Sequence, residues 1–384
     1  MIYLDNASTT FPYTEVLNIL SDKQYYFNAS NLYNKAQDCK KKIEQVRQLC
    51  LTKIHASEGT ILFTNGGCES NTTALRSIIW NHSSDTIIPH IITSSYEHHS
   101  ILSCLEMYEE KGLCKVTYIK PNSNGKIDPI DIKKAITKNE NTILISIMHI
   151  NNEVGTVNNI AEIGQIANIY DIPFMVDAVQ SFTKYPIFVD TCNISYLSFS
   201  GHKFHGPKGV GGLYVRDPKT IIPLINGGNQ EFGLRAGTYN VNAILGMGKA
   251  IEITPPEQNQ MGKYNIFKNY LIENLIHELK INPHKIHING LLNEQTPVLN
   301  FSIDGLVGEA ITLRLAEKEI YISNGSACNT GDLKPSYVLT EMGKSEKQAN
   351  SAVRISFSWG NNINEINTFI TEFVKIYKEY IGEN

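Results

Sequence analysis

An α/β fold with a mostly parallel sheet between helices is what the sequence predicts for most of this chain. Short β-branched runs alternate with helical stretches through the first two-thirds of the residues, and such alternation is typical of these sheets. The strand-like runs are Thr60–Thr64, His90–Thr93, Val116–Ile119, Ile143–Ile147 and Phe174–Val176. The helical stretches that alternate with them are Ala36–Lys53, Glu69–Trp80, Ser100–Lys111, Pro129–Thr137 and Ile160–Tyr170. Ligands bind beyond the C-terminal ends of such strands, so functional residues are expected just after strands.

A second, smaller α+β domain is expected beyond residue 256, where two prolines and a polar stretch follow a helix-like segment ending near Ile253. The elements expected there are a helix at Lys263–Lys280, strands at Val298–Ile303, Ile320–Ser323 and Val353–Phe357, and a final helix at Ile363–Tyr380. A two-domain enzyme often returns its N-terminus to the second domain. We therefore predict a large domain, 14–255, and a small domain made of 1–13 and 256–384.

The composition excludes several classes of protein. The 384 residues are 42% hydrophobic and 19% charged, which is ordinary for a globular protein able to bury a core without disulfides. A net charge of −4 argues against a nucleic-acid surface spread over the molecule. No apolar run reaches the roughly 18 residues of a membrane span. The first basic residue is Lys23, so no charged signal-peptide region is expected.

Seven cysteines stand at 39, 50, 68, 104, 114, 192 and 328, with no CxxC pair. This spacing supports neither a disulfide framework nor a four-cysteine zinc site. The expected protein is reduced and cytoplasmic, and most of its cysteines are small core residues. The composition leaves open whether one of them is reactive.

The strongest local signal is the segment 198–209, SFSGHKFHGPKG, which follows a strand-like run. A lysine held in such a loop, here Lys203, can form a Schiff base when it is desolvated or lies near other cations. The alternative is a surface turn with a solvated lysine. Metal binding by His202 and His205 is disfavoured, because the flanking Gly and Pro deny them a helix.

Two further clusters follow strands. Asp177 can pair with a cationic heterocycle and Gln180 offers both a donor and an acceptor, although Asp177 also suits a helix N-cap. In the segment 63–71, FTNGGCESN, a strand gives way to a glycine turn and then a helix whose free N–H groups suit phosphate. It matches neither the P-loop nor the GxGxxG pattern, and an ordinary β–α turn is the alternative.

The remaining candidates are weaker when read singly. His98 and His99 follow a strand, and because adjacent positions rarely share a face, at most one of them is expected to be functional. The polar loop 149–155, the Gly-rich loop 227–238 and the small-residue segment 323–331 around Cys328 have connecting loops as their alternatives. Arg354 can clamp a carboxylate, or else form an ion pair at a strand edge.

Together these segments resemble the cysteine desulfurases, which are enzymes of fold type I in the class V aminotransferase group that depend on pyridoxal 5'-phosphate (PLP). The resemblance runs from YLDNASTT at residues 3–10 to VRISFSWG at 353–360, with each motif in the family's order and near its spacing. It implies a seven-stranded sheet in the large domain and conversion of L-cysteine to L-alanine. It also implies a homodimer.

The resemblance assigns roles to matching residues. Lys203 would hold PLP as a Schiff base and shuttle the substrate's α-proton, Asp177 would pair with the ring nitrogen, and His98 would stack on the ring. Cys328 would be the nucleophile that takes the sulfur as a persulfide. The other implied contacts are Gln180 and Asn152 at the ring oxygen and substrate, Gly67, Cys68, Ser200 and His202 at the phosphate, Thr238 at the partner subunit's phosphate, and Arg354 at the substrate carboxylate.

Three positions depart from the family pattern. Cys68 stands where a Thr is usual, Ala29 where a Pro follows an Asn, and Phe232 where a basic residue precedes the Gly. A thiol donates a weaker hydrogen bond than a hydroxyl, so the phosphate would depend more on backbone N–H groups. None of these changes touches Lys203 or Cys328.

The segment SNGSACNTG resembles the subgroup that hands sulfur to scaffold and acceptor proteins for iron–sulfur assembly, tRNA thiolation or DNA phosphorothioation. Cys328 would be at most a transient cluster ligand, and no stable metal site, direct nucleic-acid contact or membrane contact is expected. The alternatives are a selenocysteine lyase or other fold-type-I PLP enzyme, and an inactive sulfur-transfer scaffold. Cys328 favours sulfur transfer over the first, and retention of Lys203, Asp177 and His98 argues against the second.

Overall fold

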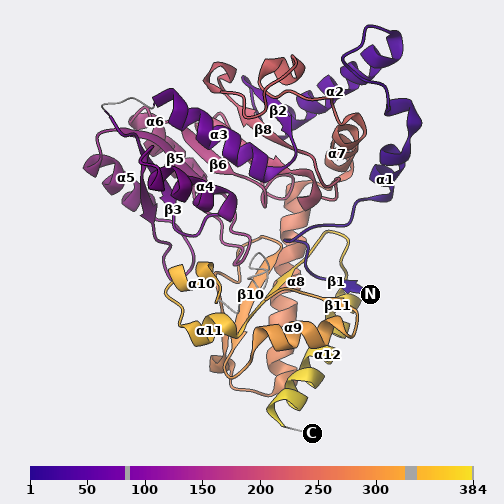
Figure 1. The fold of residues 1–384 in the computed structure, drawn as a ribbon. Coiled ribbons are helices and arrows are strands. Elements are labelled where there is room, and N and C mark those ends of the chain that lie inside the picture. The colour runs from indigo at the N-terminus through magenta and orange to yellow at the C-terminus, as the bar shows by residue number, and fades with distance from the viewer. Residues whose placement is uncertain (83–86, 325–334, 383–384) are drawn as a thin grey trace.

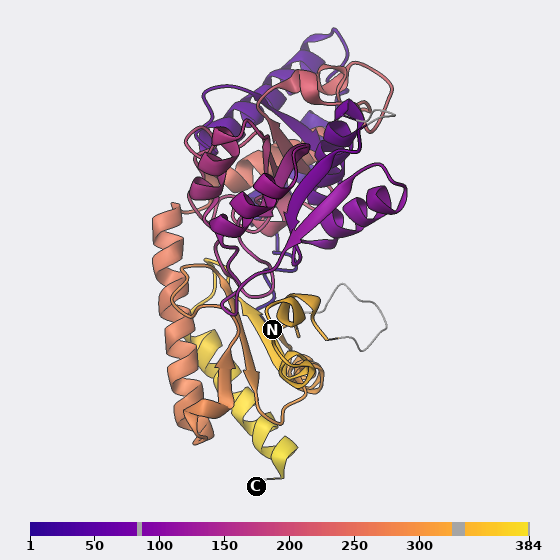
Figure 2. The same ribbon diagram turned by 90° about the vertical axis from the view of Figure 1, so that its left-hand side faces the viewer.

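The computed structural model describes residues 1–82, 87–324 and 335–382. Figure 1 shows a large α/β part, coloured indigo to magenta, above a smaller part coloured orange to yellow. The long helix α8 (Glu257–Leu279) runs from one part into the other, and in Figure 2 it lies along one side of the molecule. Among the helices that the structure describes, none has the length and apolar character needed to cross a membrane.

A seven-stranded sheet, in the order β2-β8-β7-β6-β5-β3-β4, forms the centre of the large part. The five neighbouring strands β7, β6, β5, β3 and β4 pair in parallel, whereas β8 is antiparallel to both β7 and β2. The predicted mostly parallel sheet is therefore confirmed. The bounds are β2 Thr60–Thr64, β3 His90–Ser94, β4 Lys115–Ile119, β5 Thr142–Met148, β6 Phe174–Asp177, β7 Tyr196–Ser200 and β8 Gly211–Val215.

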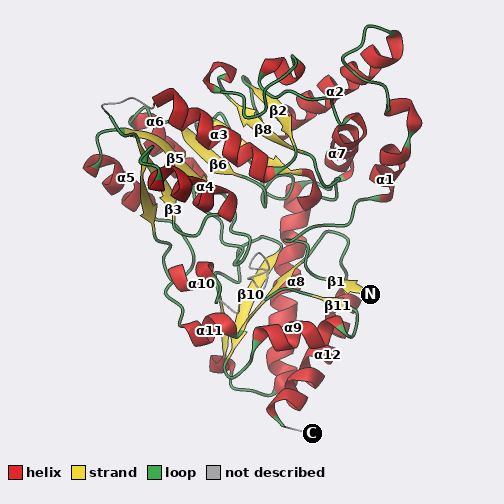
Figure 3. Ribbon diagram, viewed as in Figure 1, coloured by secondary structure: helices red, strands yellow, loops and turns green. Residues whose placement is uncertain are grey.

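Helices surround this sheet, as the red ribbons about the yellow strands in Figure 3 show. Their starts follow capping rules: Asp128 accepts the backbone N–H of Ile130 with a proline at the first helical turn, and Asn159 accepts that of Glu162. The helices are α1 Thr14–Ser21, α2 Asn34–Lys53, α3 Gly67–His82, α4 His99–Glu110, α5 Pro129–Lys138, α6 Ile160–Ile169 and α7 Val241–Ile253. Short 3₁₀ turns are η1 Lys23–Tyr25, η2 Gly201–Lys203, η3 Pro218–Thr220 and η4 Gln230–Gly233.

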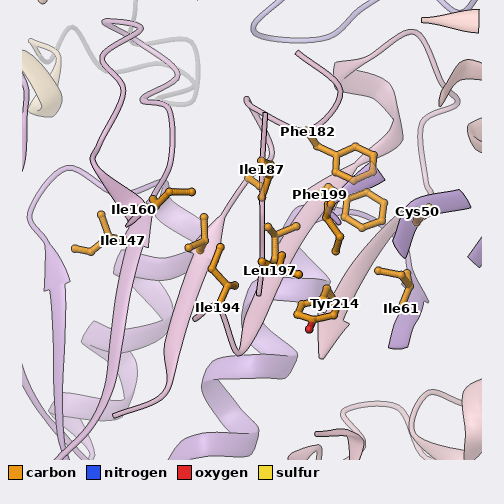
Figure 4. Packing of buried hydrophobic residues seen from close by; sticks show 14 of the residues in the cluster. Cys50, Ile61, Ile147, Ile160, Phe182, Ile187, Ile194, Leu197, Phe199 and Tyr214 are labelled. Carbon is orange, nitrogen blue, oxygen red and sulfur yellow. The ribbon is translucent and has the colours of Figure 1, made fainter. Parts of the chain in front are cut away.

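An aromatic ring on β7 packs closely against a second ring, and this packing fixes the position of the strand that leads to Lys203. Phe199 stacks on Phe182 with ring centres 4.1 Å apart and planes 7° from parallel, as Figure 4 shows. Gly212 on the neighbouring β8 leaves room for this ring, since a Cβ there would lie 2.3 Å from Phe199 Cζ. Both rings are buried, so the end of β7 has a well-determined position.

The smaller part contains an antiparallel sheet in the order β12-β10-β9. The N-terminal strand β1 (Ile2–Tyr3) pairs in parallel with β11 (Ile320–Tyr321). Its other elements are η5 Pro283–Lys285, β9 Ile286–Ile288, β10 Val298–Ile303, α9 Gly308–Ala316, α10 Tyr337–Glu341, α11 Glu346–Asn350, β12 Ala352–Ser356 and α12 Ile363–Ile381.

The small part has its own apolar cluster, built chiefly from α8, α12 and the sheet, with Leu4 among its members. Val338, Leu339 and Met342 in and after α10 instead belong to the main cluster of the large part. The two parts therefore share packing near α10, and the domain boundaries at 14 and 256 stay a prediction.

A buried ion pair joins α2 to the Gly-rich loop. Arg47 donates to both carboxylate oxygens of Glu231 at 2.8 Å, and the same carboxylate accepts the backbone N–H of Phe63 at 2.7 Å. The side chains of Arg47 and Glu231 are only 5% and 2% exposed. Glu231 thus neutralises a buried guanidinium and anchors the loop that continues to Thr238.

We expect Glu231→Gln to lower the free energy of unfolding by about 3–5 kcal/mol, because it removes the buried carboxylate and leaves the guanidinium only its pair with the more exposed Glu44. Urea unfolding followed by circular dichroism measures the change. The matched control is Glu58→Gln, since Glu58 is 61% exposed and its pair with Arg216 spans 3.6 Å. That exposed pair is expected to contribute less than about 1 kcal/mol. Equal losses in the two variants would contradict this account of the buried pair.

Candidate active site

One cavity of about 300 Å³ lies where the C-terminal ends of the large sheet's strands meet the small part. The structure brings ten of the twelve residues singled out from the sequence to its wall. These are Gly67, Cys68, His98, Asn152, Asp177, Gln180, Ser200, His202, Lys203 and Arg354. Thr238 is exposed and does not line the cavity, and Cys328 lies outside the described residues.

Lys203 ends the 3₁₀ turn that follows β7. Its ammonium donates to the backbone carbonyls of Ala7 and Ser8, both at 2.7 Å. These carbonyls belong to the N-terminal segment, which crosses from the small part to the cavity. Lys203 is therefore half-buried and held by hydrogen bonds, so the alternative of a freely solvated turn lysine is wrong.

Asp177 ends β6, and both of its carboxylate oxygens are used. Oδ1 accepts the backbone N–H of Val179 at 2.9 Å, and Oδ2 accepts the side-chain amide of Asn71 at 3.0 Å. The same amide donates to Ser100 on α4 at 2.9 Å. Two donors thus orient the carboxylate at the cavity wall, where it can meet a cationic ring nitrogen.

His98 is the N-cap of α4, and its Nδ1 accepts the backbone N–H of Ser100 at 3.1 Å. In the neutral ring this bond leaves the proton on Nε2. Burial lowers the pKa of His98, with opposing effects from Asp177, which raises it, and Lys203, which lowers it. His99 also lines the cavity, with its ring 4.7 Å from that of Tyr337. Both histidines thus line the cavity, because the helix begins between them, and the expectation that at most one of them is functional stays a prediction.

The glycine turn and the start of α3 form a narrow cradle. A Cβ at Gly67 would lie 2.6 Å from Val179 Cγ2, so only glycine fits without movement there. Cys68 is exposed to the cavity in the first turn of this 16-residue helix. Free N–H groups at such a turn suit a phosphate. His202 faces the same cavity, and burial lowers its pKa to about 4, so its ring is neutral at pH 7.

Arg354 lies on β12 and is held from three sides. Its Nη2 donates to Asp5 Oδ1 and to Ser8 Oγ, both at 2.7 Å, and its Nη1 donates to the carbonyl of Asn152 at 3.2 Å. Arg354 does form an ion pair, with Asp5, as the alternative interpretation expected. The same guanidinium also lines the cavity, so the two interpretations are compatible.

Four buried polar atoms on the cavity wall have no hydrogen-bond partner among the residues that the structure describes. They are Asn71 Oδ1, Gln180 Oε1, Asn152 Oδ1 and Arg354 Nε. Because a buried polar group without a partner costs about 1–3 kcal/mol, such atoms point to a ligand. Together with the cradle at Gly67 and the oriented Asp177, they fit a phosphorylated, cationic aromatic group bearing a ring oxygen, with a carboxylate beside Arg354.

Sequence reasoning missed several residues of the site. Ala7 and Ser8 reach it from the N-terminal segment, and Asn71, Glu153 and Ser336 come from helices or loops beside the expected motifs. Asn71 stands three positions after Cys68, so helical periodicity places both on one face of α3 and was a usable signal. No pattern in the sequence marked Ser336. Across the described ranges, no group of three or more His, Cys, Asp or Glu is arranged to hold a metal ion.

Glu97 lies directly behind the site and is fully buried. Its Oε1 accepts the backbone N–H of Met148 at 2.9 Å and the hydroxyl of Ser94 at 2.5 Å. Burial raises the pKa of Glu97 from 4.5 to about 8. The acid therefore joins the loops that carry His98 and Asn152 while staying neutral at pH 7.

The raised pKa predicts how stability changes with pH. Between pH 4.5 and 8 the folded protein keeps a proton on Glu97 that the unfolded chain releases, so this contribution is lost as pH rises through that window. The free energy of unfolding should therefore fall by on the order of a few kcal/mol across this window because of Glu97, and we expect Glu97→Gln to remove that fall. Urea unfolding at pH 5 and pH 8 measures the slope. Glu106→Gln, an exposed change on the helix α4 that follows Glu97, should keep the wild-type slope. A wild-type slope in Glu97→Gln would show that Glu97 is ionised in the folded state.

Comparison with known proteins identifies the family. The family model "Aminotransferase class-V" matches residues 2–369. The chain belongs to the class V aminotransferase family. Within that family it is 39% identical to a cysteine desulfurase IscS of Dictyoglomus turgidum over 359 residues, which cover 92% of this chain and 89% of that protein.

Solved structures of similar proteins agree with this family assignment. A NifS-like protein superposes with a TM-score of 0.86 at 30% identity, covering 98% of this chain and 99% of that one. A structure described as SspA in complex with cysteine superposes with a TM-score of 0.79 at 36% identity, covering 93% and 99%. The fold and family implied by the sequence motifs are thereby confirmed.

Proposed function

We propose that this protein is a PLP-dependent cysteine desulfurase. It converts L-cysteine to L-alanine and passes the sulfur, as a persulfide on Cys328, to an acceptor or scaffold protein. One observation carries the proposal: Lys203, the oriented Asp177 and the guanidinium of Arg354 face the same cavity. The curated relatives named cysteine desulfurase and the solved neighbour with cysteine support it.

PLP, when bound, supplies a conjugated ring that takes up the negative charge left by loss of the substrate's α-proton. Its phosphate would lie against the N–H groups at the start of α3 beside Ser200 and His202. Asp177 would hold the ring nitrogen, and the side-chain amide of Gln180 would contact the ring oxygen. His98 would cover one face of the ring. The neutral imidazole of His202 donates a hydrogen bond without adding charge.

Lys203 would hold the cofactor and then move the proton at the substrate's α-carbon. Arg354 would bind the substrate carboxylate through its unpartnered Nε, while Asp5 and Ser8 keep the guanidinium plane fixed. Asn152, whose carbonyl accepts from Arg354, would place its free Oδ1 toward the substrate. These contacts orient the α-carbon toward the Lys203 amine, and such orientation lowers the barrier by fixing the reacting groups.

Sulfur transfer then needs a thiolate near the substrate. The Cys328 sulfur attacks the substrate sulfur, a sulfur–sulfur bond forms, and the bond from sulfur to the substrate β-carbon breaks with its electron pair staying on carbon. Proton uptake at that carbon yields L-alanine. Although Cys328 lies outside the described residues, both neighbours of its segment are at the site. Ser323 pairs with the backbone of Arg354, and Ser336 lines the cavity.

We further propose a homodimer in which Thr238 reaches the cofactor phosphate of the partner subunit. Thr238 is exposed and away from its own cavity, and it follows the anchored Glu231. Large apolar side chains lie exposed on the N-terminal region and on this loop, among them Leu32, Tyr26 and Phe232. Such surfaces favour burial against a second copy. Light scattering of the purified protein measures the mass of the assembly and so distinguishes a dimer from a monomer.

The cytoplasmic location stays a prediction.

The function is tested with the purified holoenzyme. It should be yellow and should form L-alanine and sulfide in equal amounts from L-cysteine with a thiol reductant. A colourless protein that releases no L-alanine would overturn the proposal. L-Selenocysteine as the sole competent substrate would instead support a selenocysteine lyase.

A further inference from the structure

Glu153 is a buried acid on the cavity wall to which the proposed reaction gives no role. It is 3% exposed and follows Asn152 in the loop after β5. Its backbone is fixed on both sides, because its N–H donates to Asn151 Oδ1 at 2.8 Å and its carbonyl accepts from Asn300 at 3.0 Å. Its carboxyl Oε2 accepts the hydroxyl of Ser336 at 2.5 Å. The side chain therefore has a well-defined position beside the place where the substrate binds.

The charges around Glu153 do not balance once a substrate is bound. Arg354 supplies one positive charge, and Asp5, at 2.7 Å, already neutralises it. A substrate carboxylate brings one negative charge to this buried corner, and an ionised Glu153 would add a second. Two carboxylates in one buried site cannot both ionise without a large cost, so one of them keeps a proton.

We propose that Glu153 is a substrate-binding residue that acts in its protonated form, so that a carboxylate-bearing substrate binds beside Arg354 together with a proton on Glu153. This inference rests on the proposed function for the position of the substrate carboxylate. The neutral acid then donates a hydrogen bond where an anion would repel the substrate.

The protonation of free Glu153 sets the pH at which this matters. Burial raises the pKa of Glu153 to about 7, with smaller lowering effects from Ser336 and Arg354. Binding of a carboxylate raises the pKa further, so affinity is full below pH 7 and falls as the pH rises above it. The affinity for the carboxylate ligand falls by at most about tenfold per pH unit. The other titratable or charged groups that face the cavity are Lys203, Arg354, Asp177, His98, His99, His202, Cys68 and Tyr337, so the test compares variants rather than one profile.

The experiment measures proton uptake when the holoenzyme binds 3-mercaptopropionate. This ligand has the thiol and carboxylate of cysteine but no amine to react with PLP. Isothermal titration calorimetry at pH 8, in two buffers of different ionisation enthalpy, should give close to one proton taken up per ligand by the wild type and none by Glu153→Gln. The matched control is Glu97→Gln, which removes a buried acid that does not line the cavity and should keep the wild-type uptake.

A second variant tests the same idea through the partner of Glu153. The Ser336 hydroxyl lowers the pKa of Glu153, so Ser336→Ala should move the fall in affinity to higher pH. Equal proton uptake in the wild type and Glu153→Gln would overturn the inference, and so would an affinity in wild type that does not change between pH 6 and 9. Failure to bind the ligand by an enzyme that still forms L-alanine would overturn it too. Only the absence of L-alanine formation would count against the proposed function itself.

Discussion

Lys203→Ala is expected to lose the yellow absorption band and to form L-alanine at least about 10³-fold more slowly than the wild type. General acid–base transfer alone contributes roughly 10²–10⁴-fold, and this variant also loses the covalent attachment of the cofactor. The ammonium of Lys203 bonds to two backbone carbonyls at the cavity, and its side chain is half-buried and not part of the buried core. The protein should therefore stay folded. Absorbance spectra and a coupled L-alanine assay measure the two effects.

The control for Lys203 is Lys208→Ala, which removes an exposed lysine from the same loop and should keep colour and rate. Retention of the band in Lys203→Ala would mean that another amine binds the cofactor. Lys184 is the amine to test next, because it is 7% exposed and lines a small pocket together with Lys203. Burial lowers the pKa of Lys184 to about 7, with a further lowering by Lys203, so it too is able to react as a neutral amine.

Cys328→Ser is expected to abolish sulfide release while leaving the yellow colour unchanged. A hydroxyl cannot accept sulfur as a persulfide, whereas the proposed cofactor contacts are all assigned to other residues. The two substitutions thus separate the two halves of the reaction: Lys203→Ala loses the cofactor chemistry, and Cys328→Ser loses only the transfer. Sulfide is measured colorimetrically and the persulfide by mass spectrometry of the intact protein.

The structure supplies a sharp control for the Cys328 experiment. Cys68 is an exposed thiol on the wall of the same cavity, at the start of α3. Cys68→Ser should keep sulfide release, since the hydroxyl also serves at a phosphate cradle. Loss of sulfide in Cys68→Ser with retention in Cys328→Ser would assign the sulfur to Cys68 instead.

Much of the fold follows from local patterns that the sequence shows plainly. The bounds of β2 and β10 agree with prediction at both ends, because each is a run of apolar residues between turn residues. Strand β8 was not predicted, because its first two residues are glycines, which have a low strand propensity. Gly212 is required there by the neighbouring Phe199 ring, which leaves no room for a Cβ. The short elements α1, β9, α9, α10 and α11 also went unpredicted, since tertiary packing and not local pattern decides them.

The site was predictable where strand ends decide it. Asp177, His98 and Asn152 follow parallel strands and meet at one edge of the sheet, as the rule for such folds requires. Contacts from elsewhere were not predictable. The bond between Arg354 and Asp5 joins residues 349 positions apart, and no local pattern encodes such a distance. Glu153 was passed over because a carboxyl in a polar loop looks solvated until the fold buries it.

The N-terminal segment gives the site a fixed order of assembly during synthesis. Asp5, Ala7 and Ser8 hold Arg354 and Lys203, and Asp5 leaves the ribosome 349 residues before Arg354 does. At about 5–20 residues per second that interval is on the order of 20–70 s. A nascent chain that has completed the large sheet therefore still lacks a substrate site. The proposed carboxylate contact of Arg354 therefore forms only after β12 has been made and has paired with the N-terminal segment.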